Sequence, residues 1–126
     1  MQYPITFIEA GKAINEAAVP VPAPYMRRTF FLEDIPDTAP LEITAAGFYE
    51  LYINGIHITR GRMAPYISNP DEALYVDVYE LQPYLKKGEN VLGLLLGNGL
   101  VNTTSPAGKD SEFHTARFRA APCAAL

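Results

Sequence analysis

The chain has 126 residues, 48% hydrophobic and 19% charged, so it is long enough for one globular domain with a sizeable core but too short for a multidomain enzyme. Its net charge of −4 and its scattered Lys and Arg residues argue against nucleic acid or an anionic membrane as partner, because phosphate neutralisation needs clustered basic side chains. No apolar run reaches the ~20 residues of a membrane-spanning helix, and no signal peptide is recognisable at the N-terminus.

A single cysteine, Cys123, cannot form an internal disulfide, which fits a reducing compartment. Together with the absence of a signal peptide, this favours a cytoplasmic location. Cys123 lies among alanines and is expected to be an inert small hydrophobic residue. Residues 119–126 read as a strand that enters a sheet, so we expect the domain to be truncated at its C-terminus.

Residues 1–24 are predicted to form an extended arm, and residues 25–126 a single β-sandwich domain. The arm contains Pro20, Pro22 and Pro24, and a residue that precedes proline is disfavoured in the α region. The first convincing strand covers residues 27–32. A turn over residues 33–40 leads to a second strand at residues 41–45.

The strongest local signal is Asn54-Gly55, which lies between two runs of β-branched and aromatic residues. Both central residues of a type I′ turn need positive φ, and Asn and Gly tolerate it best, so residues 48–59 are predicted to form a hairpin. The two-residue turn fixes which side chains share a face. The predicted apolar face holds Leu51, Ile53, Ile56 and Ile58, and the polar face holds Glu50, Tyr52, His57 and Thr59. The apolar face must pack on another sheet, because an isolated hairpin is marginal in water.

The second half of the chain continues this pattern. Residues 61–73 are predicted to form a loop, residues 74–78 a strand, and residues 81–85 a single helical turn that Gly88 closes. Residues 91–96 are almost wholly apolar, as is typical of a central strand. A loop over residues 102–111 and a last strand at residues 113–119 follow. About seven strands without a long amphipathic helix predict an all-β antiparallel sandwich.

Three motifs resemble the N-terminal β-sandwich domain of bacterial α-L-rhamnosidases. They are Gly-Phe-Tyr-Glu-Leu-Tyr-Ile-Asn-Gly at residues 47–55, Ala-Pro-Tyr at residues 64–66, and Tyr-Leu-Lys-Lys-Gly-Glu-Asn-Val-Leu-Gly-Leu-Leu-Leu-Gly-Asn-Gly at residues 84–99. The resemblance covers roughly residues 23–102. Its most specific part is the pairing of the Asn-Gly hairpin with the Gly-Glu-Asn segment that leads into the leucine run. The Gly-Glu-Asn segment alone also resembles the jelly rolls of β-galactosidases and β-glucuronidases.

The resemblance implies a jelly-roll-like, galactose-binding-like sandwich that serves as a non-catalytic accessory domain of a glycoside hydrolase. In that family the catalytic acids lie in a separate helical barrel, so no catalytic residue is expected here. The implied partners are the catalytic domain of the parent glycosidase and a rhamnose-containing carbohydrate. A free-standing carbohydrate-binding module is the alternative. The chain departs from the family in the loop after the hairpin, where Arg60-Gly-Arg-Met stands in place of a Gly-Asp stretch.

Two loops are the candidate carbohydrate site. Sugars are bound by amides and carboxylates that hydrogen-bond hydroxyl groups, and by aromatic rings that cover the C–H face. The candidate residues are Tyr66, Asn69, Asp71, Asn98 and Asn102. The alternative is that these residues make Asx turns beside Pro70 and Gly99.

No cofactor and no metal site is expected. His57 and His114 have no metal-ligand spacing with Cys123, and the loop acids are too few for calcium. We expect His57 to form a cross-strand pair with Tyr52. A sheet edge left open by a missing strand is a candidate surface for a homodimer.

Overall fold

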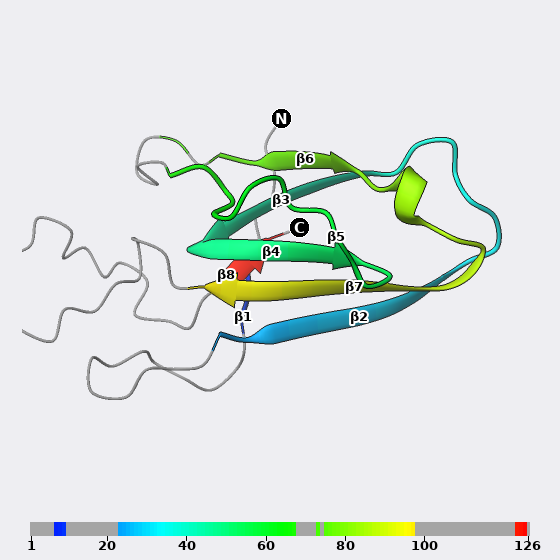
Figure 1. Ribbon diagram of the computed structural model, residues 1–126, viewed down its shortest axis with the longest axis horizontal. Helices are drawn as coiled ribbons and strands as arrows, with labels where there is room; N and C mark the ends of the chain where they lie inside the picture. Colours follow the sequence, from blue (N-terminus) through cyan, green and yellow to red (C-terminus); the bar gives the residue numbers. More distant parts are fainter. Residues whose placement is uncertain (1–6, 10–22, 68–72, 74, 98–122, 126) are drawn as a thin grey trace, which may run out of the picture.

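The computed structural model describes residues 7–9, 23–67, 73, 75–97 and 123–125 (Figure 1). They form two four-stranded sheets in which every strand pair is antiparallel. The first sheet has the order β1 (Ile8–Glu9), β8 (Cys123–Ala125), β3 (Pro40–Ala46) and β6 (Asp77–Glu80). The second has the order β2 (Tyr25–Leu32), β7 (Gly88–Gly97), β4 (Phe48–Ile53) and β5 (Ile56–His57). The all-β antiparallel sandwich is therefore confirmed.

The hydrophobic core draws side chains from both sheets. In β4 and β7, buried residues alternate with half-buried ones along most of the strand, as the two-residue period of a strand requires. The fully buried core side chains are Ile43, Tyr49, Leu51, Ile53, Leu94 and Leu96. Because β7 lies between β2 and β4, the leucine run is the central strand of its sheet, as the sequence predicts.

The predicted hairpin is present. Asn54 and Gly55 have φ values of 51° and 82°, the positive values that a type I′ turn needs. The register pairs Ile53 with Ile56, also as predicted. The burial of Ile56 is not as predicted, because its side chain is 51% exposed. It lies beside the turn on the outermost strand of its sheet, where no further strand covers it among the described residues.

The hairpin ladder ends earlier than predicted. Backbone pairing continues to the N–H of Ile58, which donates to the carbonyl oxygen of Leu51 at 2.9 Å. The N–H of Leu51 then donates to the side-chain oxygen of Thr59 at 2.6 Å rather than to a backbone carbonyl. Thr59 is therefore buried, and its predicted place on the polar face is wrong.

Strand β6 begins at Asp77, three residues later than predicted. Its partner strand β3 pairs with it only from Pro40 to Ile43. At the next position of β3, the hydroxyl of Thr44 donates to the carbonyl oxygen of Tyr75 at 2.8 Å. A side-chain contact therefore holds the chain where the backbone ladder has stopped.

The helical turn is a 3-10 helix, η1 (Gln82–Tyr84), with Pro83 in its first turn, and Gly88 follows at a φ of 91°. No described segment forms a helix with the length and apolarity needed to cross a membrane.

A buried amide, Asn90, ties the start of β7 to the chain around it. Its Nδ2 donates to the carbonyl oxygens of Lys86 and Gly88 at 2.7 and 3.1 Å. Its Oδ1 accepts from the N–H of Lys86 and from the Nδ2 of Asn54, both at 2.9 Å. Asn90 is 0% exposed, and both its donors and its acceptor positions are used.

Asn54 extends this network to the hairpin turn. Its backbone N–H donates to the carbonyl oxygen of Val91 at 2.8 Å, and its Oδ1 accepts from the Val91 N–H at 2.9 Å. Its Nδ2 also donates to the carbonyl oxygen of Tyr84 at 2.9 Å. Asn54 therefore makes both hydrogen bonds to Val91 that a paired strand residue beside β7 would make, one through its backbone and one through its side chain. Two of the three motifs that carry the family resemblance, residues 47–55 and 84–99, are therefore in direct contact.

We predict that Asn90→Asp lowers the free energy of unfolding by about 2–4 kcal/mol. The carboxylate has the same shape but cannot donate, so the carbonyl oxygens of Lys86 and Gly88 lose their partner. Urea denaturation at pH 7 measures the loss. The control is Lys87→Gln, which removes an exposed ion pair with Asp34 (2.8 Å) and should change stability by less than about 0.5 kcal/mol. Equal stability of Asn90→Asp and the control would contradict a structural role for the network.

Candidate functional site

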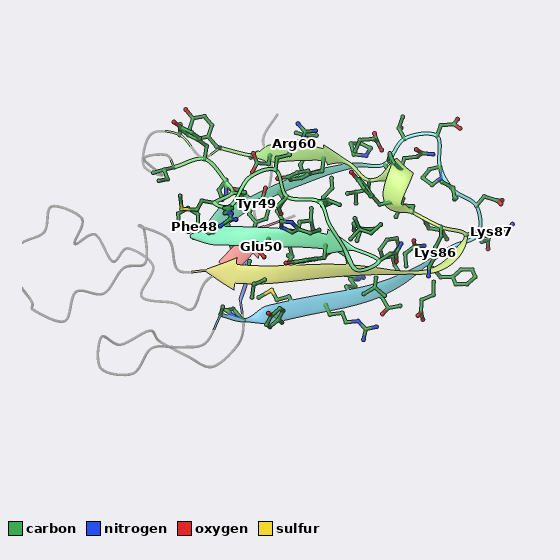
Figure 2. The ribbon with its side chains drawn as sticks, in the orientation of Figure 1. Phe48, Tyr49, Glu50, Arg60, Lys86 and Lys87 are labelled. Carbon is green, nitrogen blue, oxygen red and sulfur yellow. The ribbon has the colours of Figure 1, made fainter. Side chains whose placement is uncertain are left out.

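An open pocket of about 310 Å³ lies where the loop after the hairpin meets β6, the outer strand of its sheet. Figure 2 labels Arg60, which lies beside β6, and Tyr49, which lies on β4. The pocket is lined by Arg60, Met63, Ala64, Tyr66, Val76, Asp77, Val78 and Tyr79.

The loop that forms one wall is tied to β4. The N–H of Tyr49 donates to the carbonyl oxygen of Ala64 at 2.7 Å, and the two residues form an isolated antiparallel bridge. Ala64 is buried, whereas Met63 and Tyr66 on either side of this attachment are exposed. The loop is therefore anchored at one residue and presents its larger side chains outward.

Behind the wall formed by β6 lies a hydrogen-bonded cluster of three side chains. The hydroxyl of Tyr49, which is 1% exposed, donates to the carboxylate of Asp77. The hydroxyl oxygens of Tyr49 and Tyr79 lie 3.1 Å apart. Since the single proton of Tyr49 goes to the carboxylate, Tyr79 is the donor in this second contact.

Burial raises the pKa of Tyr49 far above its usual value, and the hydrogen bond to Asp77 raises it further. The phenol therefore stays neutral and remains a donor throughout the physiological pH range. Asp77 is half-buried and lines the pocket, so a carboxylate that this phenol holds in place stands at the pocket wall.

The rim of the pocket is aromatic and cationic. Tyr66 is 78% exposed, and its ring meets the ring of Tyr75 edge to face with the centroids 6.0 Å apart. The guanidinium carbon of Arg60 lies 5.9 Å from the centre of the Tyr79 ring, within cation–π distance. The pocket thus combines an exposed aromatic ring, a carboxylate and a guanidinium group.

Of the predicted carbohydrate residues, Tyr66 lies in this pocket. Asn69, Asp71, Asn98 and Asn102 lie outside the described residues.

Three residues of the pocket were not predicted from the sequence as site residues: Arg60, Asp77 and Tyr79. The last two stand two apart in β6 and so share the face that looks toward β4. If the strand predicted at residues 74–78 had been extended to Glu80, the sequence would have placed Asp77 and Tyr79 together on one face of it. The position of Arg60 over Tyr79 depends on a loop conformation that has no local sequence signal.

The predicted pairing of His57 with Tyr52 is confirmed, with ring centroids 4.9 Å apart. On the same strand, the hydroxyl of Tyr52 donates to Glu50 at 2.7 Å, and this hydrogen bond raises the pKa of Tyr52. In the described ranges, no group of three or more His, Cys, Asp or Glu side chains is arranged to hold a metal ion.

We predict that Tyr49→Phe lowers the free energy of unfolding at pH 7 by about 1–2 kcal/mol, because Asp77 loses its hydrogen-bond donor. The difference in stability between the unmodified chain and the variant should become smaller at high pH. Above pH ~10 an unfolded tyrosine loses its proton while the folded chain keeps it, so unfolding releases a proton. The stability of the unmodified chain therefore falls there by up to ~1.4 kcal/mol per pH unit from this group, and the variant is spared this loss. Urea denaturation at pH 7 and pH 11 measures both values. A difference in stability that is the same at both pH values would contradict the buried, protonated phenol.

The model of the family described as "Alpha-L-rhamnosidase N-terminal domain" matches residues 35–126. An α-L-rhamnosidase of Formosa agariphila is 36% identical over 77 residues, which are 61% of this chain and 8% of that protein.

Solved structures give a consistent comparison. The native α-L-rhamnosidase of Aspergillus terreus matches with a TM-score of 0.77 and 22% identity, covering 98% of this chain and 14% of that one. The α-L-rhamnosidase of Dictyoglumus thermophilum matches with a TM-score of 0.61 and 26% identity over 81% of this chain and 10% of that one. The Streptomyces avermitilis α-L-rhamnosidase complexed with L-rhamnose matches with a TM-score of 0.66 and 24% identity over 82% of this chain and 10% of that one. The chain therefore spans between 8% and 14% of the length of these relatives.

Proposed function

The chain belongs to the α-L-rhamnosidase N-terminal domain family, and from this membership we propose that it is a non-catalytic accessory domain of an α-L-rhamnosidase-like glycoside hydrolase. In this role it supports the catalytic domain and contributes to carbohydrate recognition. The observation that carries the proposal is the pocket at β6, which is lined both by one predicted carbohydrate residue, Tyr66, and by Asp77.

The single carboxylate that lines the pocket favours binding over catalysis. Glycoside hydrolysis requires two carboxyl groups about 5–9.5 Å apart across the scissile bond. Asp77 is the only Asp or Glu among the residues that line the pocket. Its carboxylate already accepts the hydrogen bond of the Tyr49 hydroxyl, a contact that suits a hydrogen-bond acceptor for sugar hydroxyl groups.

The pocket has the groups that a sugar ring needs. Asp77 offers acceptor oxygens for hydroxyl groups, and the exposed ring of Tyr66 offers a flat surface for the C–H face. A relative of the same fold, the enzyme of Streptomyces avermitilis, was solved with L-rhamnose. We therefore assign rhamnose-containing carbohydrate as the ligand class to be tested first.

A second surface fits the supporting role. The outer face of β2 carries Tyr25 and Phe31, which are 80% and 72% exposed, while Met26 on the opposite face packs against the core. Exposed aromatic side chains of this size are typical of surfaces that another protein part covers. This face is the candidate contact with the catalytic domain of the parent enzyme.

We predict that the chain binds L-rhamnose without hydrolysing a p-nitrophenyl rhamnoside. Titration followed by NMR should shift the resonances of residues 60–66 and 75–79. Tyr66→Ala should weaken the affinity roughly 2- to 10-fold, because the sugar loses its aromatic surface. The control is Tyr25→Ala, an equally exposed tyrosine on the other sheet, which should leave the affinity unchanged.

Three results would count against the proposal: turnover of the rhamnoside, silence of the pocket resonances, or equal effects of the two substitutions. Binding in the absence of any catalytic domain would also be the property of a free-standing carbohydrate-binding module. Binding of the catalytic domain to the chain, and its loss in Phe31→Ala, would distinguish the accessory domain from that alternative.

A further inference from the structure

We propose that the pocket at β6 selects a sugar that carries a carboxylate, a hexuronate residue, and that Arg60 binds this carboxylate. The inference rests on the proposed carbohydrate-binding role of the pocket and adds the chemical class of the ligand.

Arg60 is available for an anion. Its guanidinium group lies over the Tyr79 ring, a contact that uses the ring face and leaves the N–H donors at the edge of the guanidinium plane. Within the part of the chain that the structure describes, the ion pair found is Lys87 with Asp34, so no carboxylate there neutralises Arg60. An arginine that lines a pocket with its N–H fork unpaired matches the two oxygens of a carboxylate.

The negative charge of Asp77 does not cancel the preference of Arg60 for a carboxylate ligand, because Asp77 is bound to Tyr49 instead. Its carboxylate accepts the hydrogen bond of the buried Tyr49 hydroxyl and makes no ion pair with Arg60. The pocket therefore holds one positive and one negative group at separate places. A ligand with a carboxylate at one end and hydroxyl groups at the other has one favoured orientation, with its carboxylate toward Arg60 and its hydroxyls toward Asp77.

The size and shape of the pocket suit a single sugar unit. A volume of about 310 Å³ is at the lower end of the range of ligand pockets, ~300–1,000 Å³. The exposed ring of Tyr66, propped against Tyr75, supplies the apolar wall that a pyranose needs beside its polar contacts.

The loop after the hairpin is basic. It carries two arginines, Arg60 and Arg62, within three residues. Arg62 does not line the pocket, but it is exposed in the same loop and adds to the positive charge of that loop. The positive charge of the loop favours an anionic ligand over a neutral one.

The test compares two ligands that differ at one group. Methyl galacturonide has a carboxylate where methyl galactoside has a hydroxymethyl group, and L-rhamnose is the third ligand. Titration of the 126-residue chain should show about tenfold tighter binding of the galacturonide than of the galactoside at low salt. The affinity for the galacturonide, and not that for the galactoside, should fall as salt is added.

Substitutions locate the preference. Arg60→Gln should abolish the tenfold difference in affinity between the galacturonide and the galactoside. Arg60→Lys should retain part of the difference, because it keeps the charge and loses the planar fork. The control is Arg27→Gln, an exposed arginine on β2 of the other sheet, which should keep the full preference. Unchanged urea denaturation of each variant shows that the fold is intact.

Equal affinity for the two methyl glycosides, or a preference that survives Arg60→Gln, would overturn the inference. In either case, L-rhamnose binding that depends on Tyr66 would leave the proposed function standing. Failure of all three sugars to bind would overturn both, and binding of the galacturonide alone would support the inference while correcting the ligand class assigned above.

Discussion

The fold depends on the hydrogen-bonded pair of amides, Asn54 and Asn90. Asn54 lies in the tight turn between β4 and β5, and Asn90 lies near the start of β7, so the pair joins segments that are 36 residues apart. The positive φ of Asn54 turns the hairpin, while its side chain and backbone N–H pair with Val91 as a strand residue would. One residue thereby sets both the register of the hairpin and its position on the central strand.

This pair also explains why the sequence is informative about the fold. The Asn-Gly turn and the Gly-Glu-Asn segment are each common, but together they specify a contact between two strands of one sheet. The alternation in β4 and the apolar run in β7 indicated which faces are buried, because burial follows the two-residue period. The sequence pattern predicted burial wrongly where tertiary contacts decide it. Ile56 is exposed because no described strand covers that edge of the sheet. Thr59 is buried because its hydroxyl oxygen accepts the hydrogen bond of the Leu51 N–H in place of a backbone carbonyl.

Much less of the candidate site could be predicted. The exposed Tyr66 was predictable, because an aromatic residue in a long loop is an ordinary sign of binding. The cluster of Tyr49, Asp77 and Tyr79 was not, because it joins β4 of one sheet to β6 of the other. Sequence periodicity describes one strand at a time and cannot show which side chains meet across the layer between two sheets. The place of Arg60 over Tyr79 likewise follows from the path of the loop.

Tyr49 links the pocket to the stability of the domain. The ring of Tyr49 is part of the core, its backbone N–H anchors the loop at Ala64, and its hydroxyl donates a hydrogen bond to Asp77 on the facing sheet. Both walls of the pocket therefore keep their places only while the two sheets stay packed together. A ligand bound in the proposed site would therefore stabilise the packed sandwich, because binding to the folded state alone raises the free energy of unfolding.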